Sequence, residues 1–153
     1  MLPSRWPLHG WPNVWLGVTA EDQARYDQRW GKLLNVPARV RFVSYEPALG
    51  PLELGRLGPY PDWLICGGES GAGARPVEPQ WIRGIIAECR DRRVKPFFKQ
   101  WGTYLNNPLV IERGMTVAKA TARDAAGKGG GMIDGKLVRR FPTPHQCSCC
   151  EWA

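Results

Sequence analysis

A carboxylate, Glu46, directly follows a short apolar run of this 153-residue sequence, at a place where a charge needs a partner or a role. It could bind a ligand amine or a metal ion, or act as a general base. It could equally form a structural salt bridge with Lys99 or Arg41. These interpretations stay open at the level of the sequence.

A glycine-rich loop follows another apolar run and contains Gly67, Gly68, Glu69 and Ser70. The glycines would let the backbone approach a ligand closely, and the loop offers free N–H groups ahead of a helix. Arg75 could hold an anion through two parallel hydrogen bonds. The spacing matches neither the dinucleotide-binding motif nor the P-loop, so a tight turn without a ligand is the competing interpretation.

Lys99 and Gln100 follow a third apolar run, Pro-Phe-Phe. Lys99 could pair with Glu46 or Glu69, or bind the carboxylate or phosphate of a substrate. Trp101 comes next and fits the core better than the wall of a binding site.

Four short apolar segments bounded by Pro or Gly have the composition of buried parallel strands; they span residues 13–18, 39–45, 62–66 and 95–98. Residues 21–34 and 79–92 carry apolar stripes at helical spacing, the first with a capping start at Thr19 and Asp22. Residues 47–61 are too rich in Pro and Gly for more than one helical turn. We therefore predict an α/β fold, a partial parallel (β/α) barrel of about four strands and two main helices, with a small C-terminal hairpin. The candidate site residues would share the carboxyl end of its sheet.

The chain divides into three parts on composition. Residues 1–102 would form the barrel-like domain, and residues 103–128, which become rich in Ala, Gly and Lys, a mobile connection. Residues 129–153 would form a small hairpin that turns at Asp134 and Gly135, followed by a frayed tail. The tail cysteines, Cys147, Cys149 and Cys150, lack the spacing of paired zinc ligands, and we expect no metal site in this chain.

The composition restricts the class of protein. The sequence has five cysteines, an odd number that argues against a disulfide framework and for a reducing compartment such as the cytoplasm. It has no apolar stretch near the roughly 18 residues of a membrane helix and no signal peptide, so no membrane partner is expected. The net charge of +7, from 21 Lys and Arg against 14 Asp and Glu, permits binding to nucleic acid. Most of these basic residues are, however, spread along the chain.

Four ordered blocks of the sequence carry a family resemblance: WPNVWLGV at 11–18, RFVSYEP at 41–47, DWLICGGESG at 62–71 and PFFKQWG at 96–102. Together they resemble a phage-associated family of uncharacterised, radical-SAM-like proteins from bacteriophages and bacteria, the three-Cys-motif phage protein family. Residues 130–142 are similar to that family's C-terminal Asp-Gly segment.

The resemblance implies a radical S-adenosylmethionine protein whose iron–sulfur cluster is held by three cysteines near the N-terminus. This chain corresponds to the C-terminal half and lacks that motif, so we expect a truncated or split form that is inactive alone and binds no cofactor by itself. A separate polypeptide could supply the N-terminal half. In the full-length family, S-adenosylmethionine and the cluster are implied. The alternative is a non-catalytic basic module that binds nucleic acid or a partner protein.

Overall fold

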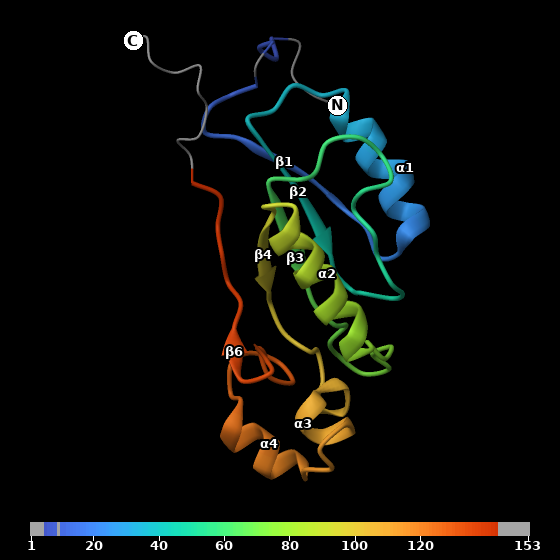
Figure 1. Ribbon diagram of the computed structural model, residues 1–153, viewed down its shortest axis with the longest axis vertical. Helices are drawn as coiled ribbons and strands as arrows, with labels where there is room; N and C mark the ends of the chain where they lie inside the picture. The colour runs from blue at the N-terminus through green and yellow to red at the C-terminus, as the bar shows by residue number, and fades with distance from the viewer. Residues whose placement is uncertain (1–4, 9, 144–153) are drawn as a thin grey trace.

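The computed structural model of the chain describes residues 5–8 and 10–143 (Figure 1). The tail with Cys147, Cys149 and Cys150 lies outside the described residues, so the expectation of a frayed tail without metal falls there too.

The core of the fold is one sheet of four parallel strands in the order β1-β2-β3-β4. Its strands are β1 (Trp15–Thr19), β2 (Val40–Tyr45), β3 (Trp63–Cys66) and β4 (Lys95–Phe98). Neighbouring strands are in close register, with Gly17 beside Phe42 and Phe42 beside Trp63. The predicted α/β class, with four parallel strands and a small C-terminal hairpin, is confirmed. Each strand begins within two residues of its predicted start.

Two helices, α1 (Gln23–Leu34) and α2 (Pro79–Asp91), connect neighbouring strands and cover one face of the sheet (Figure 1). Right-handed crossovers between consecutive strands place both helices on the same face. The capping prediction was wrong in its residue: Asp22, not Thr19, is the N-cap of α1, and its carboxylate accepts a hydrogen bond from the Arg25 backbone N–H at 2.9 Å. A side chain must lie beside the first free N–H groups of a helix to cap them, and Asp22 does. No helix interrupts residues 47–61, as predicted.

The opposite face of the sheet carries a cluster of aromatic rings that we call the aromatic face: Trp15, Phe42, Trp63, Phe97 and Phe141. Side chains alternate between the two faces along each strand. Every second residue therefore packs under the helices, and the residues between them point to the aromatic face. Trp63 lies at the centre, with ring centroids 5.7 Å from Phe42, 5.9 Å from Phe97 and 5.3 Å from Phe141. Gly17 leaves room for this packing, since a Cβ there would lie 2.3 Å from the Phe42 ring. Phe141 remains 56% exposed, so this face is only partly covered.

Residues 103–137 form a small lobe beyond the carboxyl end of the sheet (Figure 1). Its elements are η1 (Tyr104–Asn106), α3 (Pro108–Ile111), α4 (Val117–Arg123) and the hairpin β5 (Met132–Ile133) and β6 (Lys136–Leu137). Its helices were not expected from the sequence. The hairpin turn was expected, and Asp134 and Gly135 adopt φ values of 49° and 78° there. The chain then returns along the outer edge of β4, where the Phe98 N–H donates to the Val138 carbonyl at 2.7 Å.

A buried carboxylate organises this small lobe. Asp124 is 2% exposed, and its two oxygens accept hydrogen bonds from the backbone N–H groups of Gly131 and Met132, both at 2.9 Å. The side-chain amide of Asn107 donates to the Gly129 carbonyl at 2.8 Å beside it. These contacts hold the loop before β5 against the start of α3.

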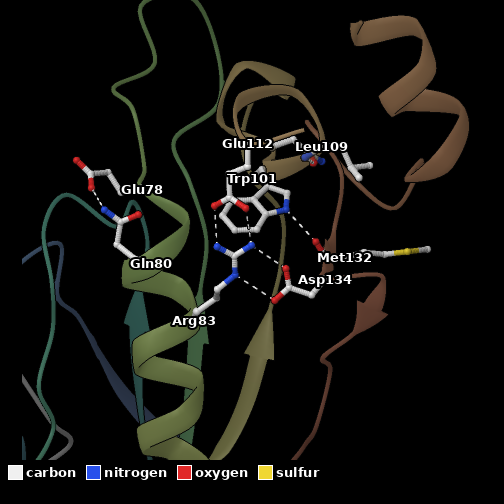
Figure 2. Close-up of polar contacts among 9 residues, drawn as sticks. Glu78, Gln80, Arg83, Trp101, Leu109, Glu112, Met132 and Asp134 are labelled. Carbon is white, nitrogen blue, oxygen red and sulfur yellow. Dashed lines mark hydrogen bonds and ion pairs between the residues drawn. The ribbon is translucent and has the colours of Figure 1, made fainter. Parts of the chain in front are cut away.

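An arginine clamp fastens the small lobe to α2. Figure 2 shows the guanidinium of Arg83 between the carboxylates of Glu112 and Asp134. Its shortest contacts are 2.7 Å to each carboxylate, and both carboxyl groups have pKa values below their usual range because Arg83 donates to them. Beside the clamp, the Trp101 indole N–H donates to the Met132 carbonyl at 2.9 Å. Trp101 is fully buried, so its interpretation as a core residue is confirmed.

In the described part of the chain, no helix has the length and the apolar character needed to cross a membrane.

Replacement of Asp124 by alanine is expected to destabilise the protein by on the order of 3 kcal/mol, because buried N–H groups would lose their acceptor. The free energy of unfolding, measured by urea titration with circular dichroism, tests this. Asp91→Ala at the exposed end of α2 is the matched control and should stay within about 0.5 kcal/mol of the wild type. Equal stabilities of the two variants would show that the small lobe does not depend on Asp124.

Candidate functional site

The carboxyl end of the sheet brings Glu46 and Lys99 together. Glu46 follows the last residue of β2, and Lys99 follows the last residue of β4. The Lys99 Nζ lies 3.5 Å from the Glu46 Oε1. The Glu46 side chain is only 17% exposed, whereas that of Lys99 is 58% exposed and turned to solvent. Of the partners considered from the sequence, Lys99 is the one that contacts Glu46.

Burial determines the chemistry of Glu46. Its carboxyl group has a pKa above the usual range because desolvation outweighs the opposing effects of Lys99 and Ser44. The carboxylate lies against the backbone of Gly67, where a Cβ would come within 2.7 Å of Oε1. A side chain at residue 67 would therefore displace this carboxylate from its present position.

Glu69 and Arg75 form a second ion pair in the loop that follows β3. The Arg75 Nε and Nη2 donate to the two oxygens of Glu69 at 2.8 and 2.7 Å, and the Arg75 backbone N–H donates to Oε2 at 2.8 Å. These hydrogen bonds lower the pKa of Glu69 to about 2. Arg75 thus makes the two parallel hydrogen bonds to an anion that were expected, but the anion is the carboxylate of Glu69 in the same chain.

The loops after β3 and β4 touch through their backbones. The Gly68 N–H donates to the Gln100 carbonyl at 2.9 Å. A Cβ on Gly68 would lie 2.3 Å from the Trp101 carbonyl oxygen, and one on Gly102 would lie 1.8 Å from that of Glu69. The close approach expected of Gly67 and Gly68 is therefore made to neighbouring protein groups.

Gln100 takes part in the same contact between loops. It is 7% exposed, donates to the Gly68 carbonyl at 3.3 Å and accepts from the Gly102 N–H at 3.0 Å. Both ends of its amide are thus used within the protein. Ser70 is exposed in the loop after β3.

Two described cysteines test whether this chain could hold an iron–sulfur cluster. Cys66 lies in β3 and Cys89 in α2, and both are buried. Burial raises the pKa of Cys66 well above its usual range and that of Cys89 to about 12, whereas a cluster binds thiolates. Within residues 5–8 and 10–143, no three His, Cys, Asp or Glu side chains gather to hold a metal ion. The described residues therefore do not fit a three-cysteine cluster.

The Glu46–Lys99 pair, by contrast, has the groups to bind a zwitterion. A half-buried carboxylate accepts hydrogen bonds from a ligand ammonium group, and an exposed lysine can bind a carboxylate or a phosphate. At 3.5 Å the two charges are close but do not form a short hydrogen bond with each other. Each therefore keeps bonding capacity for a ligand.

Three residues that hold the small lobe in place were not found from the sequence: Asp124 and Asn107 in the lobe itself, and Arg83 in α2. One signal was available in the run Gly129-Gly130-Gly131. A Cβ on Gly130 would lie 2.4 Å from an Asp124 oxygen. Three consecutive glycines indicate a close backbone approach, here to a buried carboxylate.

Comparison with known proteins identifies one family. The family model described as a protein of unknown function (DUF5131) matches residues 1–142. The match includes the sheet, both ion pairs and the small lobe. No curated protein and no solved structure matches the chain.

Glu46→Gln is expected to stabilise the protein at pH 7 by about 0.5–1 kcal/mol, because it removes a charge that burial disfavours. A carboxyl group with a raised folded pKa loses stability for the protein as the pH rises from its unfolded pKa to its folded pKa, and the cost is constant above that. The advantage of the variant should therefore disappear below about pH 4, where the carboxyl is protonated in both states. Thermal unfolding measured across this pH range tests the prediction.

Glu69→Gln is the matched control with the opposite sign. In the wild type, Arg75 lowers the pKa of the Glu69 carboxyl group in the folded state to about 2. Glu69 therefore stabilises the protein above its unfolded pKa, and this stabilisation disappears as the pH falls toward about 2. The Gln variant should be less stable than the wild type at pH 7. Loss of stability in both variants at pH 7 would contradict the strained burial of Glu46.

Proposed function

We propose a ligand-binding function for this chain, which belongs to the DUF5131 family of proteins of unknown function. The Glu46–Lys99 pair holds the ammonium and the carboxylate of an amino-acid-like ligand at the carboxyl end of the sheet. The observation that carries the proposal is the half-buried Glu46 carboxylate, whose burial raises its pKa. A group that costs stability and lies at the strand ends of an α/β fold is typical of a functional site.

The two charges divide the work of recognition. The largely buried Glu46 carboxylate lies against the Gly67 backbone, so a ligand ammonium group meets an acceptor already in position. Lys99 has a flexible, largely exposed side chain that can turn toward a ligand carboxylate. Arg75 and Glu69 neutralise each other nearby and take no part in this recognition.

The ligand class we propose is S-adenosylmethionine, in keeping with the resemblance to phage-associated, radical-SAM-like proteins. Its methionyl group presents an ammonium and a carboxylate on one carbon atom, which matches the opposite charges of Glu46 and Lys99. The described residues do not fit a cluster, so in this proposal a separate polypeptide supplies the cysteines. We derive no radical step from the residues of this chain.

The aromatic face supports that separate polypeptide as a partner. Parallel sheets of α/β proteins are normally covered on both faces, and in a barrel the face opposite the helices is the interior. Here that face is aromatic, and its ring at Phe141 is 56% exposed. The proposed occupant is a chain that carries the other strands of a barrel, which would bury these rings.

Calorimetric titration with S-adenosylmethionine tests the ligand site. Glu46→Gln and Lys99→Met should each weaken binding by about 10-fold or more, because each removes a charge-assisted hydrogen bond of roughly 1.5–3 kcal/mol. 5′-Methylthioadenosine lacks both the ammonium and the carboxylate, and it should bind far more weakly than S-adenosylmethionine.

Arg75→Gln provides the control, since Arg75 is bound to Glu69 and not to the proposed ligand. Its affinity for S-adenosylmethionine should stay within about twofold of the wild type. If both compounds bind equally well, or if neither Glu46→Gln nor Lys99→Met changes the affinity, the proposed site is wrong.

A further inference from the structure

A hollow of about 1320 Å³ lies at the amino ends of the strands, away from the Glu46–Lys99 pair. It is formed by the starts of β2 and β4, the end of α2 and the segment that returns along β4. This end of the sheet is opposite the small lobe (Figure 1). The volume exceeds the roughly 300–1,000 Å³ of small-molecule pockets, which suits a segment of a polymer better than a metabolite.

Positive charge gathers in this hollow from distant parts of the sequence. Arg90, Arg92 and Arg93 come from the end of α2. Arg39 and Arg41 come from the start of β2, with Lys95 from β4 and Arg140 from the returning segment. Asp62 is the single carboxylate among the lining residues, and it already accepts a hydrogen bond from the Arg41 backbone N–H at 2.8 Å.

Several of these cations have no acidic partner. Within the described chain, no carboxylate forms an ion pair with Arg90, Arg93 or Arg140. Like charges held close together repel one another, so this arrangement costs stability unless a polyanion binds there. Folding explains part of this cluster, since Arg90 lies in the last turn of α2 and Arg92 packs on the Tyr60 ring, but it does not explain Arg93 and Arg140.

The backbone conformation at Arg93 is also unfavourable for folding. Arg93 follows the end of α2 with a φ of 61°, a left-handed conformation in which glycine is strongly preferred. An arginine at this position is less favourable for folding than glycine would be. A non-glycine residue at a strained backbone position favours a binding role for that residue.

Aromatic rings line the hollow beside the cations. Trp15 and Tyr60 both contribute to its wall, and the guanidinium of Arg92 lies 5.2 Å from the centre of the Tyr60 ring. Arginines that track phosphates, next to rings on which bases can stack, are the combination used to bind single strands.

We propose that the hollow at the amino ends of the strands binds single-stranded nucleic acid. The arginines at the end of α2 and Arg140 contact successive phosphates, and Tyr60 contacts a base. This proposal does not depend on the ligand site at the carboxyl end. It identifies where the basic residues of the chain act together.

The test is fluorescence anisotropy of a labelled thymidine oligonucleotide of about 20 bases, titrated with the full chain at several salt concentrations. The affinity should fall steeply with salt, with a slope of about −0.7 per phosphate contacted. The double variant Arg90→Gln/Arg93→Gly should bind on the order of fivefold to tenfold more weakly and show a slope shallower by about 1.4. Arg93→Gly alone should also weaken binding while its melting temperature stays equal to or above that of the wild type.

Lys119→Gln is the control matched to Arg93→Gly, because it also removes one positive charge, here from exposed α4 at the far end of the molecule. It should leave the affinity within about twofold of the wild type. Unchanged binding in the double variant would overturn the proposal, and so would an equal loss in Lys119→Gln. Tighter binding to a duplex of the same length, or to vesicles of phosphatidylserine, would also overturn it, because a single strand would then not be the preferred partner.

Discussion

The backbone contact between the loops after β3 and β4 is the constraint on which the rest of the structure depends. Gly68 and Gly102 meet carbonyl groups of the opposite loop so closely that a Cβ at either position would collide with them. Next to this contact, the Glu46 carboxylate lies against Gly67, and the exposed Lys99 side chain lies 3.5 Å from it. The contact between the loops also carries Trp101 into the core, where its indole N–H holds the hairpin of the small lobe. The site and its support therefore follow from one arrangement of two loops.

The sheet and its two helices could be predicted because their signals are local. Apolar runs between Pro and Gly identify buried strands, and one apolar stripe identifies a helix on a core. The small lobe has no such pattern. Its order comes from the buried Asp124 and from Arg83, which reaches Asp134 across 51 positions of the sequence. Interactions of this range leave no periodicity in the sequence, so only the hairpin turn at Asp134 and Gly135 was visible in advance.

The location of the candidate site could be predicted from the sequence, but the pairing of its charged residues could not. Parallel strands bring their carboxyl ends together, which was enough to expect Glu46, Glu69 and Lys99 at one edge. Which cation meets which carboxylate depends on the loop after β3, where Arg75 folds back onto Glu69 and leaves Lys99 to Glu46. The basic hollow illustrates the same limit. Composition shows the excess charge, but only the fold brings residues from β2, α2 and the returning segment to one end.

The two ends of the sheet can act independently because distance and dissolved salt weaken the electrostatic interaction between their charges. The strands between them have four to six residues, and β2 with six residues spans roughly 20 Å at about 3.3 Å per residue. The Debye length at physiological ionic strength is only about 8 Å. The positive charge of the hollow therefore has little effect on the Glu46–Lys99 pair, and burial of Glu46, not the overall charge of the chain, determines its pKa. A polyanion at one end and a small zwitterion at the other could thus be bound at the same time without competing for the same charges.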